Sequence, residues 1–149
     1  MQGATEMLAR VVANTRLEDI PDRVVQNAKL LILDTVGVTL AAARDSGCKL
    51  LAHWVKDQES APRATVIGQG FRSSPLLAAL VNGHAAHALD YDDSGHCSTQ
   101  TLPAALALGE PAHVAGAPLN LANGARHVSM PPRRVSYRFF GLPSTTFSR

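Results

Sequence analysis

Apolar residues recur at helical spacing through most of the first 110 residues of the chain. Side chains three and four positions apart share one face of an α-helix, so each such stretch predicts a helix with a buried side. The expected fold class is all-α, a helical bundle. A β-type stretch at 64–68 is too short to be a sheet on its own. Helices are expected over residues 4–14, 21–44, 47–58, 75–91 and 98–110.

The stretch 21–44 is apolar on all sides from about Leu30 to Ala43. A helix without a polar face is expected to lie centrally, with neighbours packed around it. Gly37 lowers helix propensity by about 1 kcal/mol relative to alanine, and we expect it to permit close packing by a neighbouring helix. The longest uncharged run in the first half of the chain, Thr35 to Ala43, is too short to cross a bilayer, so no membrane partner is expected.

The third and fourth helices each carry an apolar stripe. Ser73 and Ser74 before Pro75 are a helix-start signal, because serine caps a helix and proline suits its first turn. The side chains expected to face the core are Leu50, Leu51, Trp54, Val55, Leu76, Leu77, Leu80 and Val81.

Composition changes after residue 110. Residues 1–111 hold nine Lys and Arg against twelve Asp and Glu, whereas residues 112–149 hold five arginines and no acidic residue. We therefore expect a helical domain, 1–110, and a basic, proline-rich tail, 111–149, that is disordered or read out of frame. A nucleic-acid arm is the alternative for the tail. Five arginines without a helix are only a weak sign of a nucleic-acid-binding surface, so no nucleic-acid partner is expected.

The chain as a whole has the composition of one soluble globular domain. Its 149 residues are 46% hydrophobic and 17% charged, with a net charge of +2. Cys48 and Cys97 stand alone, without the spacing of a metal site or a disulfide framework, which favours a reducing compartment. The first residues show no signal-peptide pattern. We expect a cytoplasmic protein that needs no cofactor and no metal.

Residues 82–96 concentrate the chemistry of the chain, with three histidines and three aspartates in 15 residues. Helical spacing would align His84, His87 and Asp90 on one stripe. The residues after Asp90 have the composition of a turn. Asp90 is thus expected near a helix end and His96 just before the next helix, where reactive groups are often held.

Three interpretations of this segment are open. Asp90 and His96 could exchange protons with an organic acid, each positioned group contributing about 10²–10⁴-fold. A divalent metal could be held by His84 and His87 with Asp90 or His96, as in a metal-dependent hydrolase. Alternatively, the aspartates cap and turn the chain while the histidines form hydrogen bonds inside a bundle.

Several segments resemble the N-terminal part of the MmgE/PrpD family. They are residues 22–37, 79–83, 87–93 with the sequence His-Ala-Leu-Asp-Tyr-Asp-Asp, and 102–108. The resemblance implies a cofactor-independent lyase for di- or tricarboxylates, either a hydro-lyase such as 2-methylcitrate dehydratase or a related decarboxylase. It also implies a large all-α domain and a homodimer.

Carried over by position, Asp90 and His96 look like the catalytic aspartate and the motif histidine of this family. His87 and Ser94 are then expected to orient the substrate. Family members are longer, so this chain is expected to be a truncated N-terminal portion. One alternative is a catalytically inactive helical fragment, and another is the metal-dependent hydrolase that uses His84, His87 and Asp90.

Overall fold

The computed structural model describes residues 3, 6–7, 10, 13–91, 93 and 96–114. Four helices and one two-stranded sheet dominate this part of the chain, which confirms the all-α fold class. Most of the helix expected over 4–14, and the tail beyond residue 114, lie outside the described residues. The elements are η1 (Leu17–Asp19), α2 (Asp22–Ala42), α3 (Ser46–Asp57), β1 (Ala64–Val66), β2 (Phe71–Ser73), α4 (Pro75–His87) and α5 (Cys97–Gly109).

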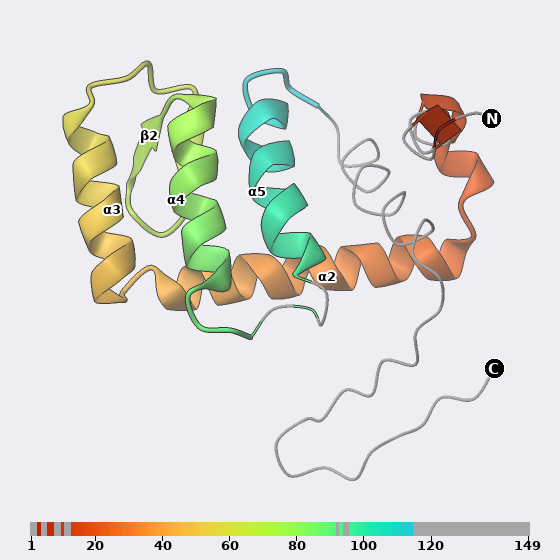
Figure 1. The fold of residues 1–149 in the computed structure, drawn as a ribbon, viewed down its shortest axis with the longest axis horizontal. Helices are drawn as coiled ribbons and strands as arrows, with labels where there is room; N and C mark the ends of the chain where they lie inside the picture. The colour runs from red at the N-terminus through yellow and green to blue at the C-terminus, as the bar shows by residue number, and fades with distance from the viewer. Residues whose placement is uncertain are drawn as a thin grey trace, which may run out of the picture.

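Three of the helices stand side by side, and the fourth and longest helix, α2, passes across their ends. Figure 1 shows α3, α4 and α5 next to one another, with α2 running along the same end of all three. Helix α4 is the central one, because it packs against α2, α3, α5 and both strands. The strands form an antiparallel hairpin in which Thr65 lies opposite Arg72. Only the first strand was foreseen, as the β-type stretch at 64–68.

Local chemistry explains where the helices begin. Asp45 precedes α3, and its carboxylate accepts hydrogen bonds from the backbone N–H groups of Gly47 and Cys48, at 2.8 and 3.4 Å. Ser74 precedes α4, and Pro75 occupies its first turn, as predicted. The Asp45 cap satisfies donors that the first turn of a helix cannot pair internally, whereas the Ser74 side chain makes no capping hydrogen bond.

The hairpin is fixed to the helices by two side chains. Asn82, which is buried in α4, accepts a hydrogen bond from the Ile67 N–H at 2.8 Å and donates one to the Thr65 carbonyl at 2.9 Å. Glu110, just after α5, accepts from the Thr65 N–H at 2.6 Å and from Arg72 Nη2 at 2.8 Å. The hairpin is therefore held against both α4 and the end of α5 by polar contacts.

The core consists mainly of small side chains. Its larger cluster joins α3, α4, α5 and β1, and a smaller one joins α2, α3 and α4. Close packing of alanine faces leaves long leucines on the outer sides of the helices. The buried members of the two clusters are Ala52, Val55, Ala64, Val66, Ala78, Val81 and Ala107, with Ala42, Cys48 and Ala85.

Helix α2 is not buried on all sides in the part of the chain that the structure describes, so that expectation was wrong. Its buried residues are Ala28, Thr35, Thr39 and Ala42, which share one face, while Leu33 on the opposite face is 69% exposed. Apart from its chain neighbours and the backbone of its own helix, no described residue has an atom within 4 Å of where a Cβ of Gly37 would be, so the expected close packing there was also wrong. The two threonines donate to backbone carbonyls of their own helix, at 2.7 and 2.6 Å.

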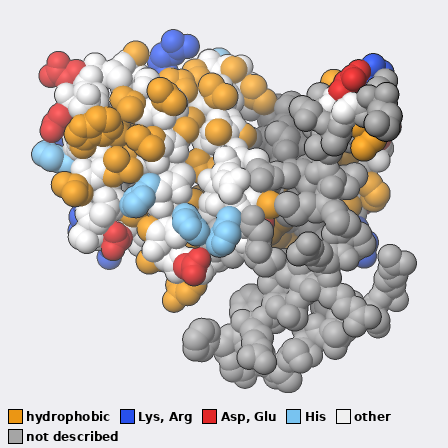
Figure 2. Space-filling view, in the orientation of Figure 1, with side chains coloured by type: hydrophobic (Ala, Val, Ile, Leu, Met, Phe, Trp, Pro, Cys, Tyr) orange, Lys and Arg blue, Asp and Glu red, His pale blue; other side chains and the backbone are white. Residues whose placement is uncertain are grey.

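The outer faces of α3 and α4 also differ from expectation. Leu50, Trp54, Leu76 and Leu80 are exposed rather than buried. Figure 2 shows apolar side chains gathered over the α3–α5 part of the face in view, with histidines beside them. Periodicity marks the faces of a helix but not which apolar face a neighbour covers.

Among the described residues, α2 is the one helix whose length and apolar content would allow it to cross a membrane. Core helices of soluble proteins pass the same test, and an ionisable Asp34 lies within α2. The expectations of no membrane partner and of a cytoplasmic location therefore stay predictions.

Candidate active site

The candidate site lies where α4 ends and α5 begins. Helix α4 stops at His87, three residues before Asp90 and short of the end expected near residue 91. The chain then turns, with the Asp90 N–H donating to the His87 carbonyl at 3.0 Å and Asp90 in the left-handed region at φ 54°. The single helical stripe expected for His84, His87 and Asp90 is therefore wrong.

The start of α5 is positioned by Asp93 and His96. The Asp93 carbonyl accepts from the His96 N–H at 2.8 Å, and the Asp93 carboxylate accepts from the Ser98 N–H at 3.1 Å. His96 is the residue before the helix and has φ 51°, again in the left-handed region. Aspartate and histidine adopt this conformation more readily than most residues, and in folded proteins it often occurs at functional sites.

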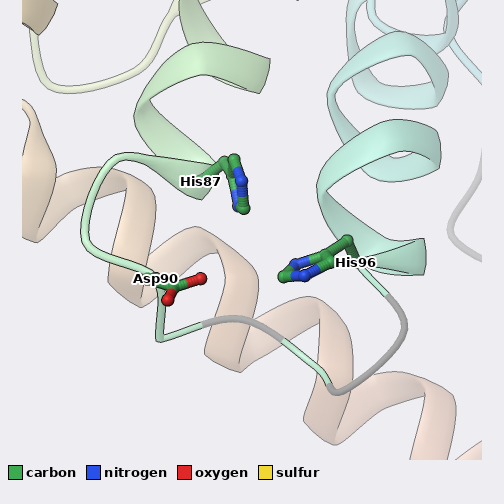
Figure 3. A group of neighbouring side chains, drawn as sticks. All are labelled: His87, Asp90 and His96. Atoms are coloured by element: carbon green, nitrogen blue, oxygen red, sulfur yellow. The ribbon is translucent and has the colours of Figure 1, made fainter.

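These turns bring three side chains together. His87, Asp90 and His96 each offer a nitrogen or oxygen atom, and these atoms all lie within 4.8 Å of one another. The two imidazole rings meet edge to face, with centroids 4.8 Å apart and planes at 77°. Figure 3 shows the three side chains directed towards a shared space from the end of α4, the loop and the start of α5. All three are exposed.

A groove between α4 and α5 leads towards this cluster. Its volume is about 480 Å³. His84 in its lining lies one helical turn before His87, and Thr99 lies one turn after His96, so the cluster is one turn beyond this end of the groove. The lining residues are Leu76, Ala79, Leu80, Gly83 and His84 from α4, with Thr99, Gln100, Pro103 and Ala104 from α5.

The predicted site residues are thus only partly brought together. Asp90, His96 and His87 converge, whereas His84 does not belong to the group. Its Nε2 atom lies 3.5 Å from where a Cβ of Gly47 would be, over the start of α3. Ser94 lies outside the described residues. The metal set of His84, His87 and Asp90 is therefore not assembled, because α4 ends before Asp90.

Sequence reasoning missed Thr99, whereas capping by an aspartate of this segment was one of its three interpretations. Asp93 caps α5, and Thr99 both lines the groove and donates from its hydroxyl to the His96 carbonyl at 3.0 Å. The signal for Asp93 was an aspartate shortly before a helix start. The two cysteines are buried and form no disulfide, and burial, reinforced by the Asp45 charge, raises the pKa of the Cys48 thiol.

The arrangement defines a helical protein with an acid/base cluster between two helix ends. In sequence, residues 6–124 match the MmgE/PrpD N-terminal domain. The chain therefore belongs to the MmgE/PrpD family. The match runs past the boundary expected at residue 110.

The chain is similar to part of several proteins named as cis-aconitate decarboxylases. It is 33% identical to human cis-aconitate decarboxylase and 30% identical to the mouse enzyme, each over 115 residues that make up 74% of this chain and 24% of the relative. Cis-aconitate decarboxylase of Aspergillus terreus is 29% identical over 113 residues, or 72% of this chain and 23% of the relative. The chain thus spans about a quarter of the length of these relatives.

Proposed function

We propose that this chain carries the acid/base site of a lyase for di- or tricarboxylates. The observation that supports this most is the convergence of His87, Asp90 and His96, from two helix ends and the loop between them. Imidazole and carboxylate groups are common general acids and bases, and elimination or decarboxylation next to a carboxylate requires proton transfer. The decarboxylase relatives favour loss of carbon dioxide over dehydration.

With cis-aconitate as the substrate, the reaction balances with a single proton. The bond between the methylene carbon and its carboxylate breaks and releases carbon dioxide. Its electron pair forms a new carbon–carbon double bond to the central carbon. The electron pair of the original double bond then takes a proton at the far carbon, beside the remaining carboxylate. The product is an unsaturated dicarboxylate, and the protein must donate one proton per turnover.

His96 and Asp90 are the proposed acid/base pair, and His87 and Ser94 orient the substrate. An imidazole of His96 can donate the proton, and Asp90 can accept a hydrogen bond that holds the donor in place. A protonated imidazole of His87 can hold a substrate carboxylate, because charge-assisted hydrogen bonds to carboxylates are the stronger kind. Homodimer formation also belongs to this proposal, since it rests on the family resemblance.

The test is release of carbon dioxide from cis-aconitate by the purified protein. In heavy water, the product should carry one deuterium at the carbon that received the proton, which nuclear magnetic resonance detects. Dehydration of 2-methylcitrate, measured in parallel, would instead release water without carbon dioxide. Turnover of 2-methylcitrate alone would replace decarboxylation by dehydration in this proposal.

A catalytically inactive helical fragment is the competing interpretation. It predicts no turnover of either substrate, and no difference between the wild type and variants of Asp90 or His96. His53→Gln provides a matched control, because His53 is an exposed histidine on α3 that pairs with Asp57 at 3.8 Å. Activity that survives at Asp90 and His96 variants but falls in the His53 variant would contradict the proposed site.

A further inference from the structure

We propose that His87, Asp90 and His96 form a binding site for a divalent first-row transition metal, of which zinc is the natural probe. Two imidazoles and one carboxylate are a donor set that binds zinc with one coordination position left for water or another ligand. Of the described residues, these are the ones whose donor atoms form such a group. No metal was expected from the sequence, and the site proposed here also differs from the alternative set of His84, His87 and Asp90, since His96 replaces His84.

The geometry of the cluster is close to what zinc requires. Zinc binds nitrogen and oxygen at about 2.0–2.2 Å, so the donors of a tetrahedral site lie about 3.3–3.5 Å apart. The donor atoms here lie within 4.8 Å of one another. Closing the difference takes about 1 Å of side-chain movement. Exposed side chains at a helix end and in a loop can make such a movement by small changes in their side-chain torsions.

Exposure of all three residues leaves room for the ion to enter and for a fourth ligand. The nearest comparison in the fold is the pair of His53 and Asp57, whose atoms approach to 3.8 Å on one face of α3. That pair has a single imidazole, and among the described residues no third donor joins it in such a group. It therefore provides an internal control for weak binding by an isolated histidine and carboxylate.

Metal binding would compete with proton transfer, because an ion takes up the lone pairs that a donor or acceptor uses. Metal-loaded protein should then be inactive in decarboxylation. This consequence rests on the proposed function, whereas binding of the ion itself does not. The two are separated by measuring zinc binding without any carboxylate present.

The experiment is equilibrium dialysis of the chelator-treated 149-residue protein against zinc in a non-coordinating buffer. One zinc ion per chain is expected. His87→Gln, Asp90→Asn and His96→Asn should each weaken binding at least about tenfold, since even loss of an outer-shell partner costs 10- to 100-fold. Asparagine tolerates the left-handed backbone of positions 90 and 96, so these two variants should keep the fold.

Controls and spectroscopy complete the test. His53→Gln should leave zinc affinity unchanged. Cobalt, used in place of zinc, should give visible d–d absorption without a thiolate band, because Cys48 and Cys97 are buried and are not part of the group. The proposal is overturned if the folded protein binds no zinc at micromolar concentrations. It is also overturned if both His87→Gln and His96→Asn, shown to be folded by circular dichroism, bind as tightly as the wild type.

Discussion

Two polar regions of the α4–α5 pair differ in how their side chains are used. On the side of the hairpin, Asn82 within α4 and Glu110 after α5 bind backbone groups of Thr65 in β1 and of Ile67 just after it, so these side chains have a structural role. At the histidine end, His87, Asp90 and His96 are exposed and face one another. The fold thus pairs a satisfied polar network that holds the helices with an exposed cluster that is available for chemistry.

Replacement of the acid/base pair should have the largest effect. Asp90→Asn and His96→Asn should each lower the rate of decarboxylation at least about 100-fold, because each removes a group that can move a proton. The free energy of unfolding of both variants should lie within about 0.5 kcal/mol of the wild-type value, as expected for exposed positions. Enzyme assays and urea unfolding measure the two quantities. If these variants lost activity only because they were unfolded, the distinction between the exposed cluster and the structural contacts of Asn82 and Glu110 would be contradicted.

Asn82→Leu should have the largest effect on stability. The substitution leaves the Ile67 N–H and the Thr65 carbonyl without their partner, and an unsatisfied buried group costs about 1–3 kcal/mol. We expect a loss of about 2–4 kcal/mol in the free energy of unfolding, measured by urea denaturation. His87→Gln in the exposed cluster is the comparison variant and should lower the free energy of unfolding by less than about 0.5 kcal/mol. Similar costs for the two variants would contradict the assignment of Asn82 as a structural anchor.

Glu110→Gln should produce a smaller, pH-dependent loss. The pKa of the Glu110 carboxyl is lowered, chiefly because the Thr65 N–H donates to it, although partial burial acts in the opposite direction. A lowered pKa stabilises the fold above the ordinary range of glutamate, about pH 4.3, and this contribution is lost as the pH falls through the lowered value. The difference in unfolding free energy between wild type and variant should therefore shrink on acidification from neutral pH. A difference that grows in acid would contradict this sign.

Glu59→Gly should have the smallest effect, a gain in stability of about 0.5–1 kcal/mol. Glu59, after α3, has φ 47° and lies outside the cluster, and glycine adopts this backbone without strain. His96→Gly relieves the same kind of strain at φ 51° but should abolish activity. Thermal unfolding and enzyme assays compare the two variants. Retained activity in His96→Gly would show that only the backbone shape matters at this position.

Much of the fold followed from local patterns. Helix α2 and helix α5 begin and end within about two residues of their expected bounds, because caps, prolines and periodicity act locally. Which face of each helix is buried did not follow from these local patterns. Leu76 and Trp54 are apolar and periodic but exposed, since tight packing through alanines decides which side of each helix is buried.

The sequence placed His87, Asp90 and His96 in one short segment but did not predict how their side chains converge. Turn composition after Asp90 correctly placed Asp90 and His96 on either side of one bend. Helix α4 ends three residues before Asp90, and the left-handed residues Asp90 and His96 lie in the connection to α5, so His96 and not His84 joins the cluster. The contact of Glu110 with Thr65 joins residues far apart in the chain and has no local signal.

Nuclear magnetic resonance of the histidine side chains during titration with cis-aconitate tests the central claim most directly. The account predicts saturable shifts of the imidazole signals of His87 and His96 with one common dissociation constant, and no shift for His53. In Asp90→Asn the shifts of both imidazoles should change, because the carboxylate that faces them is lost. Uniform small shifts of all histidines, or none at His87 and His96, would contradict the assignment of this cluster as the carboxylate-binding acid/base site.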